Sequence, residues 1–121
     1  MPLTKTPLTY QVRVPDFEQG LKFYTKLLGR EPDFVPHEDF AEWQLIDLCW
    51  LQLNKGTPAA GSGPLRFGVV DIESERERVQ RDLGVDGFDL EEREGVPVFW
   101  GTFSDPWGNQ LGFFQLRPAE N

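Results

Sequence analysis

The stretch VRVPDFEQGLKFYTKLLG, residues 12–29, decides the fold, because it holds the end of a strand, the start of a helix and the end of that helix in order. Residues 8–14 alternate apolar and polar side chains, which is the pattern of a strand with one buried face. Pro15 stops the strand, Asp16 is a typical N-cap, and Gly29 is a typical C-cap. The stretch therefore predicts a strand followed directly by a capped helix.

Three further strands are expected after this helix, because the next residues are rich in aromatic and apolar side chains interrupted by Pro, Asp and Asn. The expected strands lie near residues 32–36, 41–47 and 49–54. The helix should bury the apolar residues that recur at helical spacing. These are Phe17, Leu21, Tyr24 and Leu28. The first module is thus a βαβββ unit over about residues 7–54.

The second half of the chain repeats the first. Residues 55–63 are rich in Gly, Pro, Ala and Ser, and we expect them to form a linker. After it, Asp71 and Gly84 are 13 residues apart, as are Asp16 and Gly29, so the cap, helix and stop recur. The strands of the second module are expected near residues 65–71, 88–92, 96–102 and 110–116. We predict one α+β domain over residues 1–121, whose second βαβββ module covers about residues 64–116.

A second stretch, FSDPWGNQLGFF at residues 103–114, predicts a tight turn before the last strand. Pro106 presets its own φ angle, and Gly108 or Asn109 can adopt a positive φ.

With both stretches in this order around an internal repeat, the chain resembles the vicinal oxygen chelate superfamily. That superfamily includes glyoxalases, extradiol dioxygenases, fosfomycin-modifying enzymes and bleomycin-resistance binding proteins. The resemblance implies two βαβββ modules whose eight strands curl into one mixed sheet, a cup that holds the ligand. It also implies a homodimer in which modules pair across chains.

The resemblance locates a metal site in the cup, at positions that carry His, Glu or Gln in the metal-dependent members. In this chain those positions are Thr9, Gln52, Pro64 and Gly112. Proline and glycine have no donor side chain, threonine is a poor ligand, and one neutral amide cannot hold a divalent ion. The single histidine, His37, lies between Pro36 and Glu38 in a turn-like stretch and is expected to be solvated. We therefore predict no metal and no cofactor.

Strand parity suggests which side chains line the cup, because residues two apart on a strand share a face. The predicted ligand-binding residues are Gln11, Arg13, Trp43, Trp50, Gln52, Arg66, Trp100, Gln110 and Phe114. The register of Trp43 and Trp100 is open, so either could face inward or pack in the core. Arg13 and Arg66 favour a ligand with a carboxylate, phosphate or carbonyl group, although each could instead pair with an acid such as Glu42 or Asp47.

The acidic composition excludes some partners. A net charge of −8 with a pI near 4.6 argues against nucleic acid and against an anionic membrane surface, since both need clustered basic residues. No stretch is apolar enough to span a membrane, and the start lacks the order of a secretory signal, so we expect a cytoplasmic protein. The only cysteine, Cys49, is expected to be buried. The glutamates near residues 73–77 and 91–94 are interpreted as surface charge, although a negative field also favours cationic small molecules.

Three functions remain open. The preferred hypothesis is a metal-independent binding protein of the glyoxalase/bleomycin-resistance type that sequesters a small aromatic or heterocyclic ligand. The alternative is a lyase, isomerase or dioxygenase of the same superfamily that uses Arg13, Arg66 or Gln52 to stabilise charge, or a metal completed by a second chain. A third possibility is an interaction module whose cup is filled by its own aromatic side chains.

Overall fold

The structure, a computed structural model, describes residues 7–59 and 63–118. The chain divides into two compact units, Met1–Ala59 (unit 1) and Ala60–Asn121 (unit 2). Among the described residues, no helix is both long enough and apolar enough to cross a membrane.

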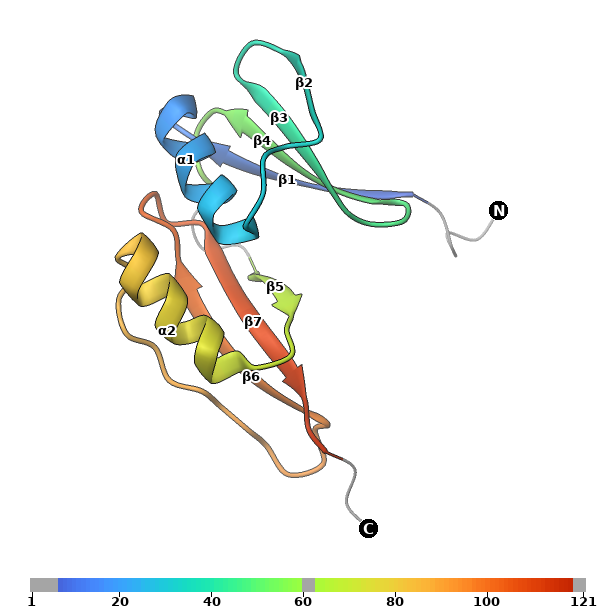
Figure 1. Ribbon diagram of the computed structural model, residues 1–121, viewed down its shortest axis with the longest axis vertical. Helices are drawn as coiled ribbons and strands as arrows, with labels where there is room; N and C mark the ends of the chain where they lie inside the picture. Colours follow the sequence, from blue (N-terminus) through green and yellow to red (C-terminus); the bar gives the residue numbers. More distant parts are fainter. Residues whose placement is uncertain (1–6, 60–62, 119–121) are drawn as a thin grey trace. The chain divides into compact units, whose positions relative to one another are not determined.

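Unit 1 has the predicted order of one strand, one helix and three strands (Figure 1). Its elements are β1 (Leu8–Val14), α1 (Phe17–Leu28), β2 (Phe34–His37), β3 (Phe40–Ile46) and β4 (Cys49–Lys55). The four strands form one sheet in the order β1-β4-β3-β2, in which β1 runs parallel to β4 and the other pairs are antiparallel. The outer strand β2 is short, and all four of its residues are exposed.

Helix α1 begins and ends at the predicted residues. The side chain of Asp16 accepts a hydrogen bond from the backbone N–H of Gln19, and Gly29 ends the helix with a φ of 77°. The buried face agrees with the predicted one at Tyr24 and differs at the other three predicted residues. Gly20, Phe23, Tyr24 and Leu27 are buried, whereas Phe17, Leu21 and Leu28 are only partly covered. The reason is Gly20, whose missing side chain lets the helix backbone approach Val14 of β1.

Unit 2 repeats the arrangement with fewer strands. Its elements are β5 (Leu65–Gly68), α2 (Ile72–Leu83), β6 (Val98–Ser104) and β7 (Gln110–Leu116). The strands form a second sheet in the order β5-β7-β6, with β5 parallel and β6 antiparallel to β7. Asp71 caps α2 by accepting from the N–H of Ser74, and Gly84 ends it with a φ of 66°. The predicted repeat of cap, helix and stop is therefore confirmed.

The strand predicted near residues 88–92 is wrong. There the structure has a single isolated bridge, between Glu91 and Trp100, and the described strands form a four-stranded sheet in unit 1 and a three-stranded sheet in unit 2. Phe88 and Leu90 instead cover β6 at Gly101, where an added Cβ atom would lie 2.8 Å from the Phe88 ring. The segment is held by these two side chains and by the two backbone hydrogen bonds between Glu91 and Trp100, and its Asp and Glu residues have low strand propensity.

The predicted turn before the last strand is confirmed, and a buried carboxylate organises it. Asp105 accepts hydrogen bonds from the backbone N–H groups of Trp107 and Asn109, each at 2.9 Å. The side-chain amide of Asn109 donates to the other Asp105 oxygen at 2.8 Å. Gly108 takes the positive φ, at 95°. The buried carboxylate is thus satisfied by donors of its own turn.

The close approach of α1 to β1 can be tested with Gly20→Ala. A Cβ atom at this position would meet the buried Val14 side chain at 2.5 Å, and Val14 has no room to move. The free energy of unfolding should fall by about 1–2 kcal/mol, which is the cost of overpacking less the gain in helix propensity. Urea denaturation measures this change.

Gly87→Ala is the matched control, because a Cβ atom there would come no closer than 3.7 Å to Gln80. Its free energy of unfolding should stay within about 0.5 kcal/mol of the parent value. Equal losses for the two variants would contradict the close approach.

Asp33, in the loop before β2, is expected to contribute to the free energy of unfolding in a manner that depends on pH. The backbone N–H of Gln44, at 2.7 Å, and the guanidinium of Arg30, at 2.9 Å, both donate to Asp33 and hold the pKa of this carboxyl below its usual value. A lowered pKa stabilises the folded chain above the unfolded value of about 3.9, and this contribution is lost as the pH falls through the folded value.

Asp33→Asn should therefore be less stable than the parent chain at neutral pH, and the difference should shrink as the pH is lowered through this range. Denaturant titrations at a series of pH values measure it. A difference for Asp33→Asn that is independent of pH would contradict the assignment.

Candidate functional site

Unit 1 carries a chain of hydrogen bonds across one face of its sheet. Gln11, Gln52 and Glu42 occupy neighbouring positions on β1, β4 and β3. The amide of Gln11 donates to Gln52 at 3.4 Å, and the amide of Gln52 donates to Glu42 at 3.1 Å. The Nε of Arg13 donates to the oxygen of Gln11 at 3.1 Å. The structure thus brings three predicted site residues together and adds Glu42, whose carboxylate ends the chain.

An aromatic pair lies on the same face. Trp50 pairs with Gln44, and Phe34 pairs with Glu42, so both aromatic residues share the face of the hydrogen-bonded chain. Their ring centroids are 5.7 Å apart. Trp50 was predicted as a site residue. Phe34 could not be predicted, because its strand is short and its register depends on a bulge.

Trp43 does not belong to this face. It pairs with Leu51 on the opposite side of the sheet and is 0% exposed. Its indole N–H donates to the backbone carbonyl of Arg30 at 3.0 Å, so its one polar group is satisfied inside the unit. The sequence left open whether Trp43 faces the ligand or packs in the core. The structure places it in the core, so Trp43 is removed from the predicted ligand-binding residues.

In unit 2, the side chain of Arg66 lies over Gly112 of the neighbouring strand. Arg66 of β5 lies beside Gly112 of β7, and its guanidinium donates to the hydroxyl of Thr102 on β6 at 2.9 Å. A Cβ atom at Gly112 would lie 2.9 Å from Cγ of Arg66 and would collide with the carbonyl oxygen of Gly101. No ion pair among the described residues involves Arg66.

Arg66 forms one wall of a hollow of about 360 Å³. The other lining residues are Val96, Val98, Trp100 and Phe114. Trp100 pairs with Phe114, which places its side chain on the same face of the sheet as Arg66. Gln110 shares this face but lies at the exposed start of β7, outside the hollow. The hollow offers one cation and aromatic surface within a volume typical of small-molecule sites.

The residues at the superfamily's metal positions do not fit a divalent ion. Gln52 already exchanges hydrogen bonds with Gln11 and Glu42, and Gly112 is covered by the positively charged Arg66. Thr9 and Pro64 contribute at most one weak hydroxyl donor. Within residues 7–59 and 63–118, no three His, Cys, Asp or Glu side chains come close enough together to hold a metal.

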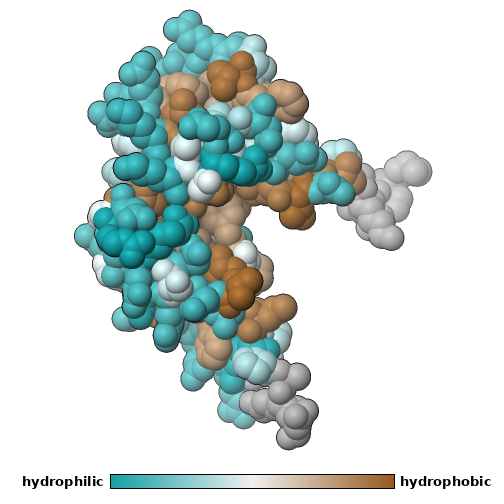
Figure 2. Space-filling view, viewed as in Figure 1, coloured by the Kyte–Doolittle hydropathy of each residue, from teal (hydrophilic) through white to brown (hydrophobic). Residues whose placement is uncertain are grey.

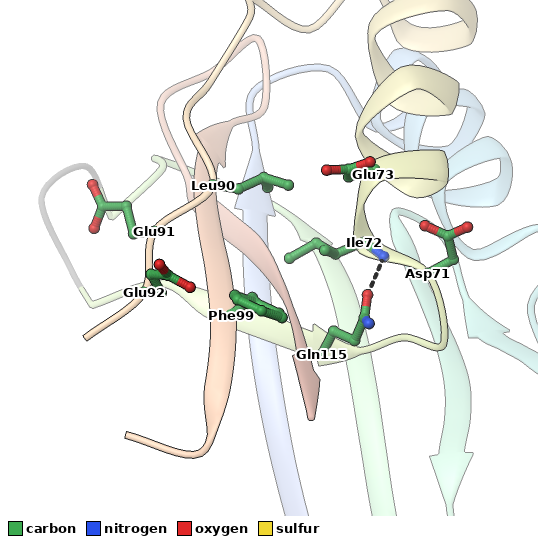
Figure 3. A pocket seen from close by; sticks show the side chains of 8 residues that line it. All are labelled: Asp71, Ile72, Glu73, Leu90, Glu91, Glu92, Phe99 and Gln115. Atoms are coloured by element: carbon green, nitrogen blue, oxygen red, sulfur yellow. Dashed lines mark hydrogen bonds between the residues drawn. The ribbon is translucent and has the colours of Figure 1, made fainter. Parts of the chain in front are cut away.

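A second hollow, of about 390 Å³, lies on the α2 side of unit 2 (Figure 3). Apolar side chains from α2, β6 and the segment before β6 line it, with carboxylates around them. The lining residues are Asp71, Ile72, Glu73, Leu90, Glu91, Glu92, Phe99 and Gln115. The glutamates of this hollow were interpreted from the sequence as surface charge only, because no sequence pattern indicates that residues 73 and 92 line the same hollow. The one available signal was Leu90 between acidic residues.

Comparison with solved structures identifies the fold and the family. A glyoxalase/bleomycin resistance protein from Catenulispora acidiphila DSM 44928 is 30% identical, with a TM-score of 0.73, and the match covers 93% of this chain and 99% of that one. A glyoxalase/bleomycin resistance protein/dioxygenase from Nocardioides has 16% identity and a TM-score of 0.73, over 100% of this chain and 89% of that one.

The genomically encoded fosfomycin resistance protein of Listeria monocytogenes has 16% identity and a TM-score of 0.70, over 95% of this chain and 94% of that one. No protein-family model matches the chain, and no curated protein matches it. The match at 30% identity over nearly the whole of both chains carries the assignment, and the more distant structures agree with it in fold. This chain belongs to the glyoxalase/bleomycin resistance protein family of the vicinal oxygen chelate superfamily.

Proposed function

We propose that this chain is a metal-independent binding protein that sequesters a small planar aromatic or heterocyclic molecule carrying a carboxylate or a comparable oxygen group. The observation that carries the proposal is the hollow in which Arg66 stands beside Trp100 and Phe114. A guanidinium binds two oxygens of one carboxylate at once, and a flat ring gains contact area against an aromatic side chain. These two features together favour a ligand that is flat and anionic.

The position of Arg66 supports binding without a metal. Its side chain lies over Gly112, at a position where the metal-dependent members of the superfamily place a donor. A fixed positive charge at this position attracts the oxygens that a metal would otherwise attract, and it disfavours a divalent ion nearby. Thr102 holds the guanidinium through its hydroxyl, so a ligand finds the donor already oriented.

The polar face of unit 1 supports the same function. Its chain of hydrogen bonds ends in Arg13 at one side and Glu42 at the other, and Trp50 with Phe34 adds an aromatic surface. Such a face suits a heterocycle that both donates and accepts hydrogen bonds.

An enzyme of the same superfamily, such as a lyase, isomerase or dioxygenase, is the second candidate. The observation in its favour is Glu42, the carboxylate at the end of the hydrogen-bonded chain, which stands where a general base could act. Activity on hemithioacetals and catechols, measured with and without added metal, distinguishes this candidate from a binding protein.

We also propose that the protein is a cytoplasmic homodimer. Figure 2 shows a hydrophobic area over the beginning of β1 and the β3–β4 turn. Leu8, Ile46 and Leu48 are exposed at this end of unit 1. Apolar side chains grouped in this way favour a protein interface over open solvent.

The binding function can be tested with 2-naphthoate and chelator-treated protein. Calorimetric titration should show saturable binding, and the ligand should raise the midpoint of thermal unfolding. Arg66→Gln should weaken the affinity by about tenfold, because it removes a charge-assisted contact to the carboxylate. Neutral 2-naphthalenemethanol should bind the parent chain about as weakly as 2-naphthoate binds Arg66→Gln.

Arg81→Gln is the matched control, because Arg81 is an exposed arginine on α2 that pairs with Asp82. It should leave the affinity for 2-naphthoate unchanged. Loss of binding after chelation, with recovery on adding a transition metal, would overturn the metal-independent function. So would elemental analysis showing about one tightly held metal per chain in protein purified without chelator.

A further inference from the structure

The hollow on the α2 side of unit 2 is built from three elements and has an apolar floor. Ile72 begins α2, Phe99 lies on β6, and Leu90 lies on the segment that precedes β6. Figure 3 shows these three side chains pointing toward the same space. They are held there by other contacts: Ile72 is 3% exposed, and its N–H donates to the side-chain oxygen of Gln115 at 2.8 Å. The hollow is thus supported by its surroundings.

Carboxylates stand at the rim of this floor. In Figure 3, Glu73 extends from α2 toward Leu90, and the Glu92 carboxylate lies beside Phe99, whereas Glu91 turns away. None of the ion pairs among the described residues involves Glu73 or Glu92. Their charges therefore act on whatever enters the hollow.

The start of α2 does not offset this negative charge by attracting an anion. Asp71 already accepts the N–H of Ser74, and Gln115 already accepts the N–H of Ile72, so two of the amide groups that an anion would use are occupied. An anion would also meet the rim carboxylates.

Phe99, in the apolar floor of the hollow, already contacts a positively charged residue of the same chain, Arg117. The guanidinium carbon of Arg117 lies 5.4 Å from the centre of the Phe99 ring, in a cation–π contact. The same guanidinium donates to the backbone carbonyls of Arg93 and Val96, each at 3.3 Å, which holds it over the ring. The Phe99 ring therefore makes a cation–π contact with a residue of the chain itself.

We propose that this hollow is a second ligand site, which binds a small amine with a hydrophobic body. The body packs on Ile72, Leu90 and Phe99, and the ammonium group lies between Glu73 and Glu92. A volume of about 390 Å³ fits a single ring with a short chain. This site is separate from the Arg66 hollow, because it lies on the opposite face of the unit 2 sheet and shares no lining residue with it. It also selects the opposite charge.

Phenethylamine tests the proposal, with methyl NMR signals of Ile72 and Leu90 as the readout in the full chain. Both signals should shift in a saturable manner. The double variant Glu73→Gln and Glu92→Gln should weaken binding by about five- to tenfold, because each exposed charge contributes modestly. Added salt should weaken binding to the parent chain.

The double variant Glu77→Gln and Glu94→Gln is the matched control, since it removes the same charge from the same two segments outside the hollow. It should keep the parent affinity within about twofold. An equal loss in both double variants would overturn the site, because only the net charge would then matter. Equal binding of neutral 2-phenylethanol, or binding of a lysine-rich peptide but not of phenethylamine, would overturn it as well. A failure here leaves the titration with 2-naphthoate unaffected, and the reverse also holds.

Discussion

The missing side chain at Gly112 is the constraint on which unit 2 depends. A Cβ atom there would come too close to the carbonyl oxygen of Gly101, so β6 and β7 would have to shift where they pair at this position. The same empty space lets the stem of Arg66 lie flat on the sheet and reach Thr102. A single glycine thus controls both the strand pairing and the direction in which a positive charge points. Backbone packing and ligand chemistry cannot be changed independently at this position.

Much of the fold could be predicted from the sequence because it is encoded locally. Asp16 and Asp71 each cap a helix through their own side chains, and Gly29 and Gly84 each end one with a positive φ. These signals need only neighbours in the chain. The segment near residues 88–92 could not be predicted in this way, because its position depends on Phe88 and Leu90 packing over Gly101, a contact between distant residues.

Part of the candidate site could be predicted, because alternate residues of a strand lie on the same face of the sheet. Gln11, Gln52 and Arg66 lie on the faces that their spacing indicated. Trp43 and Trp100 could not be assigned, because both faces of a β-sheet accept tryptophan and only the pairing partner decides. The hollow beside α2 could not be predicted from the position of Leu90 between acidic residues, since it joins the start of a helix with a segment that lies many residues later.

The outer strand β2 has a consequence for how the protein behaves in crowded solution. A strand at the edge of a sheet offers unpaired backbone groups to which a strand of another molecule can add. Pro36 removes one N–H donor from this short strand, and the bulge between Phe34 and His37 breaks its regular spacing. An incoming strand would find an incomplete row of partners there. This edge of unit 1 is thereby protected against the edge-to-edge aggregation that exposed sheets invite.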